Sequence, residues 1–215
     1  IKANIGDVII ACDGQEIAEE AKRIGAKFVI TDPNLPSGTD RIYEAYKQIS
    51  QDKDYIKNIE IILNLQGDLP NIDPKIIAST ADIALKQNCD ITTIASKIIE
   101  KSEINNPNVV KIAIAFKEEN VGKALYFSRS AIPYGKENEE FYHHIGIYAY
   151  KKESLEKFVN LKQSALEKRE SLEQLRALEN DMNIYVNIVA TNPLSVDTRE
   201  DLENVTKNII ANEKT

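Results

Sequence analysis

The sequence predicts a single α/β domain over residues 1–215, with a mainly parallel central sheet and a small antiparallel β extension at about 109–150. Three observations support this fold class. Strand-like and helix-like segments alternate through the first half of the chain. The segment 59–65 is almost continuously apolar, as expected for a parallel strand covered on both faces. Short β segments then follow one another between 109 and 150 without helices between them.

The first elements are marked by the residues at their ends. The segment 7–11 is mostly apolar and too short for a helix, so we expect a strand there. Asp13 and Glu16 have the spacing of a capping box, and Gly25 stands where helices commonly end, so a helix is expected between them. A second strand is expected at 27–31.

The same alternation continues along the chain. Ser37 or Thr39 can cap a helix, and Pro74 suits the first turn of a later one. The expected elements are a helix to about residue 48, a strand at 59–65, a helix from 74 to about 86 and a strand at 90–95.

The second half of the chain has more β character before it returns to helices. Short β segments are expected at 109–116, 124–127 and 145–150, helices at 152–161 and 166–180, a strand at 184–190 and a C-terminal helix. Ser164 with Glu167 forms a capping box for the helix at 166–180, and Thr198 with Asp201 opens the last helix.

The composition excludes several classes of protein. The chain has 215 residues, 42% of them hydrophobic, which is enough to bury one large core. Its net charge of -7 provides no electrostatic source for sequence-independent binding of nucleic acid. No apolar run approaches the roughly 18 to 20 residues of a membrane helix, and no leader is visible, so we expect a cytoplasmic protein without membrane insertion. Cys12 and Cys89 form no disulfide framework or zinc spacing and are interpreted as core residues.

A candidate metal site follows the apolar strand at 59–65. Gln66, Gly67 and Asp68 come at the edge where open α/β sheets bind ligands, and a carboxylate there suits a divalent cation bound to phosphates. Asp197, directly before the last helix, is the second candidate carboxylate if the two segments meet. The alternatives are a plain turn at Asp68 and a helix cap at Asp197, and the residues alone leave both open.

Two further candidates lie at a helix start and a strand end. Ser37, Gly38 and Thr39 offer hydroxyls and free amides at a helix start, which attracts anions. The alternative is an ordinary capped helix. Arg129 closes a strand and could bind a carboxylate with two hydrogen bonds.

Two pairs of residues share a face of their expected elements. His144 and Tyr148 are separated by an even number of residues in a strand, and such a face could bind a polyhydroxylated acid. A structural histidine is the alternative. Glu170 and Gln174 lie four residues apart on the expected helix 166–180, where ordinary solvated polarity is the alternative.

The order of these motifs carries more information than any one of them. Read together, SGTDR, NLQGDLP, NPNVVKI, LYFSRSAIPY, HHIGIYAY, SALEKRESLEQLRALE and SVDTREDLENV resemble the 3-deoxy-manno-octulosonate (Kdo) cytidylyltransferases, in register from about Gly6 to Val205. The resemblance implies a Rossmann-like nucleotidyltransferase fold and transfer of CMP from CTP to Kdo, which gives CMP-Kdo and pyrophosphate for lipopolysaccharide biosynthesis. It also implies Mg²⁺ as cofactor and a homodimer formed largely through the β extension.

The resemblance also implies roles for the candidate residues. Asp68 and Asp197 would be the catalytic Mg²⁺ ligands. The remaining candidates would bind substrate, with Ser37, Gly38 and Thr39 beside the cytidine, and Gln66, Arg129, His144, Tyr148, Glu170 and Gln174 toward Kdo.

The chain departs from the family pattern at three places. Leu69 stands where the family has Glu, and the stretch at 134–142 is shorter than usual and lacks an Arg. The opening strand and phosphate-binding loop of the family have no counterpart here, so we expect such a segment upstream of Ile1. The alternatives to the Kdo enzyme are a cytidylyltransferase for another 2-keto sugar acid, such as sialic acid, and a non-catalytic nucleotide-binding homologue.

Overall fold

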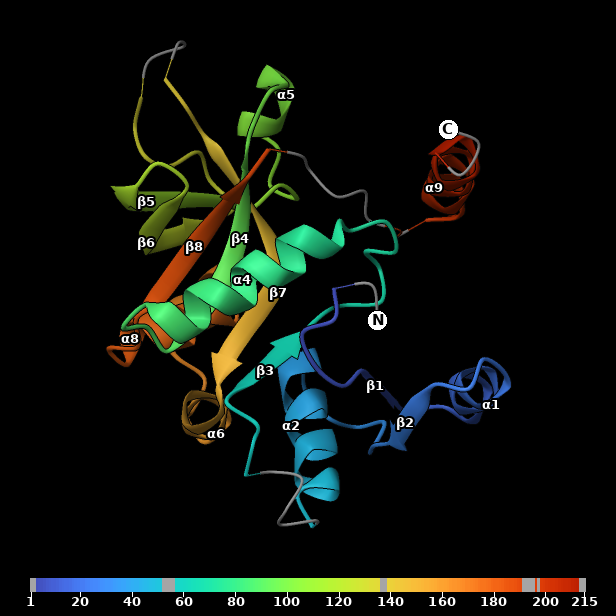
Figure 1. Cartoon of the computed structure of the whole chain (residues 1–215). Coiled ribbons are helices and arrows are strands. Elements are labelled where there is room, and N and C mark those ends of the chain that lie inside the picture. Colours follow the sequence, from blue (N-terminus) through green and yellow to red (C-terminus); the bar gives the residue numbers. More distant parts are fainter. Residues whose placement is uncertain (1–2, 52–56, 136–138, 191–195, 197, 213–215) are drawn as a thin grey trace.

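A computed structural model describes residues 3–51, 57–135, 139–190, 196 and 198–212 of the chain. Its largest feature is a six-stranded sheet (Figure 1). In spatial order the strands are β3 (Ile61–Asn64), β7 (Tyr142–Lys151), β4 (Ile91–Lys97), β8 (Ile184–Val189), β6 (Val121–Ser128) and β5 (Lys111–Glu118). The α/β class and the central sheet predicted from the sequence are therefore confirmed.

The first two strands form a separate parallel pair. They are β1 (Ile9–Cys12) and β2 (Lys27–Ile30), connected by α1 (Gln15–Arg23). Gly25 lies between α1 and β2 with a φ of 71°, the left-handed conformation that glycine adopts most readily. The helix α2 (Gly38–Ile49) contacts β1, β2 and β3, so it connects the pair to the large sheet.

The pairing of the large sheet is less parallel than expected. β3, β4 and β8 run in one direction, but only β4 and β8 are direct parallel neighbours. The reason is β7, which was expected as part of a peripheral extension. It instead lies antiparallel between β3 and β4, with Ala149 opposite both Leu63 and Thr92. The prediction of a mainly parallel sheet is wrong in this respect, because the apolar pattern of a central strand does not reveal its direction.

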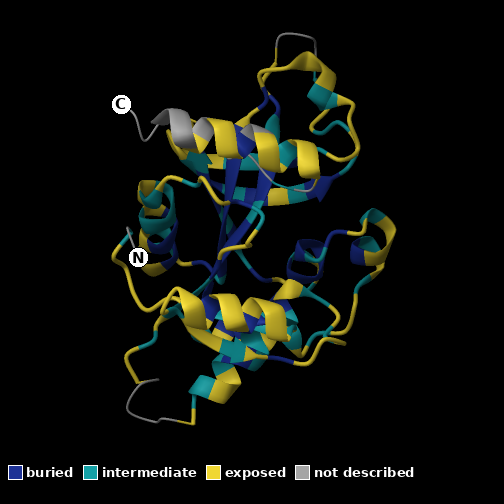
Figure 2. Cartoon of the chain, turned by 90° about the vertical axis from the view of Figure 1, so that its right-hand side faces the viewer, coloured by how far each residue is buried: buried dark blue, intermediate teal, exposed yellow. Residues whose placement is uncertain are grey.

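Side chains on the two faces of the sheet form two cores. On one face Phe127, Tyr150, Phe158 and Leu175 belong to a cluster that includes side chains of α6 (Lys152–Val159) and α8 (Gln174–Glu179). On the other face, a smaller cluster of Leu69, Ile94, Ile145, Ile147 and Val189 packs beside α4 (Pro74–Lys86). The edge-on view shows buried strands between helices whose outer surfaces are exposed (Figure 2).

The helix expected at 166–180 is two short helices. They are α7 (Ala165–Glu170) and α8, and the chain turns between them at Ser171, whose φ is 54°. The predicted capping box of Ser164 and Glu167 is confirmed at the start of α7. Glu167 also accepts two hydrogen bonds from the Arg176 guanidinium, and this buried ion pair holds the two helices together.

The remaining elements lie at the periphery. The sequence did not predict the short helix α5 (Lys101–Ile104), and α9 (Arg199–Asn212) follows the predicted Thr198–Asp201 cap. Cys12 and Cys89 are buried free thiols, as expected. No helix in the described part of the chain is long and apolar enough to cross a membrane.

Candidate active site

The loop after β3 places Asp68 against the segment that precedes α9. The Asp68 carbonyl accepts a hydrogen bond of 2.8 Å from the backbone N–H of Val196. The two segments therefore meet, as the metal-site prediction requires. Asp197, the second predicted carboxylate, lies outside the described residues.

The environment of Asp68 suits a cation ligand. Its Oδ1 atom is shielded from solvent and has no hydrogen-bond partner within the described residues. A buried carboxylate oxygen without a donor is costly unless a ligand or ion satisfies it. Leu69, which replaces the family Glu, instead points into the core beside Ile94 and Ile147.

Gln66 extends from the same loop toward β7. Its side-chain amide nitrogen lies 3.7 Å from the position that a Cβ would take on Gly146. The glycine in the HHIGIYAY motif therefore leaves room for Gln66 to approach the strand that carries His144 and Tyr148. These three candidates come together although they lie about 80 residues apart in the sequence.

His144 and Tyr148 share one face of β7, as the sequence predicts. Their ring centroids are 5.6 Å apart, and the His144 ring also meets Phe127 edge-on at 4.9 Å. His144 Nε2 lies 2.9 Å from the Thr93 hydroxyl. Burial lowers the pKa of His144 to about 3, with a smaller contribution from His143, so the ring is neutral near pH 7. Burial also raises the pKa of Tyr148, with the nearby Glu173 contributing, so its hydroxyl stays protonated.

The start of α2 combines helix capping with a contact to α8. Ser37 is the N-cap, since its Oγ accepts from the Asp40 N–H at 3.2 Å and donates to the Asp40 carboxylate at 2.7 Å. Gly38 is open, with nothing within 4 Å of a Cβ built there. Thr39 is buried, and its hydroxyl donates to Glu173 Oε1 at 2.6 Å. The capping alternative is therefore observed at Ser37, while Thr39 links two motifs distant in sequence.

Arg129 and Glu170 are held together by several hydrogen bonds. The Glu170 carboxylate accepts from the Ser128 hydroxyl at 2.8 Å and from the Arg129 N–H at 3.0 Å. The Arg129 guanidinium donates to the backbone carbonyls of Glu170 at 2.9 Å and Pro107 at 3.0 Å. Both residues therefore occupy one junction between β6 and α7.

The expectation that Glu170 and Gln174 share a helix face is wrong. Glu170 ends α7 and Gln174 begins α8, because the chain turns at Ser171. Gln174 is buried. Sequence reasoning missed its neighbour Glu173, whose carboxyl group is bound to Thr39. Burial raises the pKa of Glu173, and its Oε2 atom has no partner among the residues described.

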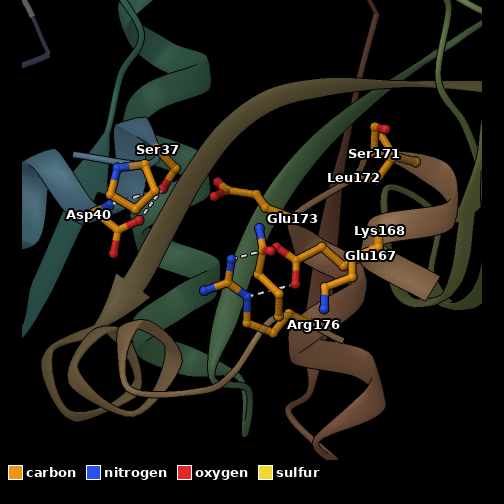
Figure 3. Close-up of a pocket in the computed structure, with 10 residues that line it drawn as sticks. Ser37, Asp40, Glu167, Lys168, Ser171, Leu172, Glu173 and Arg176 are labelled. Carbon is orange, nitrogen blue, oxygen red and sulfur yellow. Dashed lines mark hydrogen bonds and ion pairs between the residues drawn. The ribbon is translucent and has the colours of Figure 1, made fainter. Parts of the chain in front are cut away.

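A cavity of about 280 Å³ opens beside Glu173. Figure 3 shows the Glu173 carboxyl group pointing toward Ser37 and Asp40, with the Glu167–Arg176 ion pair on its other side. The lining residues are Pro36, Ser37, Asp40, Gln163, Glu167, Lys168, Ser171, Leu172, Glu173 and Arg176. The start of α2 and the α7–α8 turn thus face each other across a polar cavity. No periodicity in the sequence points to Glu173. Its position within the LEQLR run is the signal that could have indicated it.

The chain is similar to known proteins along nearly its whole length. A family profile described as "Cytidylyltransferase" matches residues 2–188. The 3-deoxy-manno-octulosonate cytidylyltransferase of Bartonella tribocorum is 50% identical over 206 residues, which cover 96% of this chain and 82% of that protein. The protein of the same name from Rickettsia prowazekii is 46% identical over 206 residues, which cover 96% of this chain and 79% of that protein.

Solved structures agree with the sequence comparisons. A CMP:2-keto-3-deoxy-manno-octonic acid synthetase complexed with CTP has a TM-score of 0.85 and 31% identity, over 98% of this chain and 83% of that one. An apo UDP-glucose pyrophosphorylase, with a TM-score of 0.61 and 12% identity, shares the fold alone. The chain therefore belongs to the cytidylyltransferase family and, within it, to the 3-deoxy-manno-octulosonate cytidylyltransferases.

Proposed function

We propose that this chain transfers CMP from CTP to Kdo and releases pyrophosphate, supplying an activated sugar for lipopolysaccharide biosynthesis. The observation that carries the proposal is the 43–50% identity to proteins named for this activity, over at least 94% of the chain. The approach of Gln66 to the strand that carries His144 and Tyr148 supports it as well.

The sugar acid would lie over the His144 face of β7. The Thr93 hydroxyl lies 2.8 Å from the Ile147 carbonyl, which can only accept, so the hydroxyl proton belongs to that bond. Thr93 Oγ1 then accepts from His144 Nε2–H, and the lone pair of this neutral ring is on Nδ1. Nδ1 and the protonated Tyr148 hydroxyl would therefore offer one acceptor and one donor to sugar hydroxyls.

The phosphate side would be organised by the loop after β3. The anomeric hydroxyl of Kdo would attack the α-phosphorus of CTP in line as pyrophosphate leaves, so the protein would contribute mainly position and electrostatics. Asp68, whose Oδ1 has no donor among the residues that the structure describes, and Asp197 would hold Mg²⁺, which when bound neutralises phosphate charge. No covalent enzyme intermediate is required.

The β extension would form a homodimer interface in a cytoplasmic enzyme. Phe116 on β5 and Leu125 on β6 are 47% and 57% exposed, which supports coverage by a second copy. Light scattering after gel filtration tests this part of the proposal, and a monomeric mass at micromolar concentration would reject it.

A pyrophosphate-release assay tests the reaction itself. We expect release from CTP only when Kdo and Mg²⁺ are both present. Release with sialic acid in place of Kdo would favour a different 2-keto acid. Nucleotide binding without turnover in the full-length protein would favour the non-catalytic alternative.

A further inference from the structure

Lys111, the first residue of β5, is fully buried. Its exposed fraction is 0%, and its ammonium group donates to three backbone carbonyls, those of Asn106 at 2.8 Å, Val109 at 2.6 Å and Arg129 at 2.6 Å. All three N–H donors of the ammonium are thereby satisfied. No carboxylate among the described residues forms an ion pair with it, so the charge is neutralised mainly by peptide dipoles.

Two of these carbonyls belong to one tight turn. The Val109 N–H donates to the Asn106 carbonyl, and the Asn106 side chain accepts from the Asn108 N–H at 3.0 Å. The next residue, Val110, accepts from the His144 N–H at 2.8 Å. The turn that Lys111 closes is therefore bonded directly to the backbone of a predicted sugar-binding residue.

The third carbonyl belongs to Arg129, at the junction with Glu170. The backbone of Arg129 is held by a second bond, because its N–H donates to the Glu170 carboxylate. The Arg129 guanidinium reaches back to the carbonyl of Pro107, within the turn. Lys111 thus connects Arg129, Glu170 and His144 through short bonds, although it lies too deep to reach a ligand.

A neutral side chain would replace this group only in part, because hydrogen bonds from a charged donor are the stronger ones. Burial lowers the pKa of Lys111, helped by the positive charge of Arg129 and opposed by Glu170. Substitution would remove the ammonium donor from all three carbonyls, and only the bond from the Val109 N–H to the Asn106 carbonyl is known to remain. Loss of a hydrogen bond to a partly buried carbonyl costs free energy.

We propose that Lys111 is a positioning residue that holds Arg129, Glu170 and His144 in register for the sugar acid. This inference rests on the proposed function, because it names the Kdo side of that site. Lys111 would therefore affect the affinity for the acid and not the affinity for CTP. Its hydrogen bonds do not extend to the start of α2, where the cytidine is expected.

The test compares Lys111→Met with Lys151→Met in the full-length protein. Lys151 lies at the far end of β7 and donates to one backbone carbonyl, that of Gln87 at 3.2 Å, so it controls for loss of a carbonyl-bound lysine. We expect Lys111→Met to raise the KM for Kdo about tenfold, with the KM for CTP changed by less than about twofold. Lys111→Gln, which keeps two donors, should give an intermediate rise, and Lys151→Met should match the unmutated protein.

Hydrogen exchange gives a readout independent of turnover. In Lys111→Met, amide exchange should accelerate at 106–110 and 128–130 but not in α4. Equal rises in both KM values, unchanged kinetics, or exchange that accelerates throughout the chain would overturn the proposal. If Lys111→Met does not fold, Lys111→Gln decides by the same criteria. Absence of turnover in the unmutated protein would reject the proposed function instead, and the exchange pattern would still decide whether Lys111 holds the junction.

Discussion

The buried ion pair between α7 and α8 makes a quantitative prediction about stability. The side chains of Arg176 and Glu167 are only 8% and 6% exposed, and Arg176 Nε donates to Glu167 at 2.9 Å. Arg176→Met keeps the aliphatic part of the side chain but removes the guanidinium, whose central carbon lies 4.8 Å from the centre of the Phe158 ring, and leaves the Glu167 carboxylate buried without its cation. Breaking such a pair from one side typically costs about 3–5 kcal/mol.

The local structure places the expected loss at the lower end of this range. Glu167 keeps the hydrogen bond from the Ser164 N–H in the capping box, so its charge is not wholly unsatisfied. We expect Arg176→Met to lower the free energy of unfolding by about 3 kcal/mol. For a chain of this size the melting temperature should fall by about 6–12 °C.

The double variant tests the cause. Glu167→Leu combined with Arg176→Met removes both charges and the Glu167 half of the capping box, and should lose only about 1 kcal/mol. Lys86→Met, which breaks the exposed pair with Asp82, is the matched control and should be indistinguishable from the unmutated protein. Urea unfolding followed by circular dichroism measures all four proteins. A loss below about 1 kcal/mol for Arg176→Met, or an equal loss in the double variant, would refute the reasoning.

Three further predictions concern the site. Asp68→Asn should reduce pyrophosphate release at least about a hundredfold while leaving urea unfolding almost unchanged, because a loop carboxylate that holds the metal is not core packing; equal losses of both would contradict the metal role. Thr93→Val removes the hydroxyl bound to His144 and should raise the KM for Kdo about two- to tenfold, measured beside the KM for CTP as an internal control. The lowered pKa of His144, about 3, means that the folded state binds fewer protons than the unfolded state below pH 6.5, so stability should fall as pH falls through that window. Between pH 7 and pH 5 the His144 contribution is a loss of about 2 kcal/mol, and urea unfolding of His144→Asn, which should lack this loss, checks it.

The sequence predicted most of the features that depend on neighbouring residues. The capping box expected of Asp13 and Glu16 is wrong, because Gly14 is the N-cap of α1 and no side chain caps this helix. Ser164 and Glu167 form their capping box, Gly25 ends α1, and Ser37 caps α2. In each case a hydrogen bond or a backbone angle within a few residues decides the structure. The alternation of β7 likewise placed His144 and Tyr148 on a common face.

The sequence could not predict features that depend on distant partners. The direction and central position of β7 depend on pairing with β3 and β4. The turn at Ser171 interrupts a run of good helix formers because the buried Glu167–Arg176 pair and the core fix α8 separately. Glu173 was missed for a related reason, since its partner Thr39 lies 134 residues away.

The position of β7 also has a consequence for the order in which the chain can fold. β3 and β4 are complete by residue 97, yet they do not pair with each other, because β7 takes the place between them and ends only at Lys151. During synthesis the edges of β3 and β4 that later pair with β7 therefore stay unpaired while more than fifty further residues are added. Unpaired strand edges promote association between chains. A nascent chain released before Lys151 would lack the strand that joins β3 to β4, so its first half is not an independent folding unit.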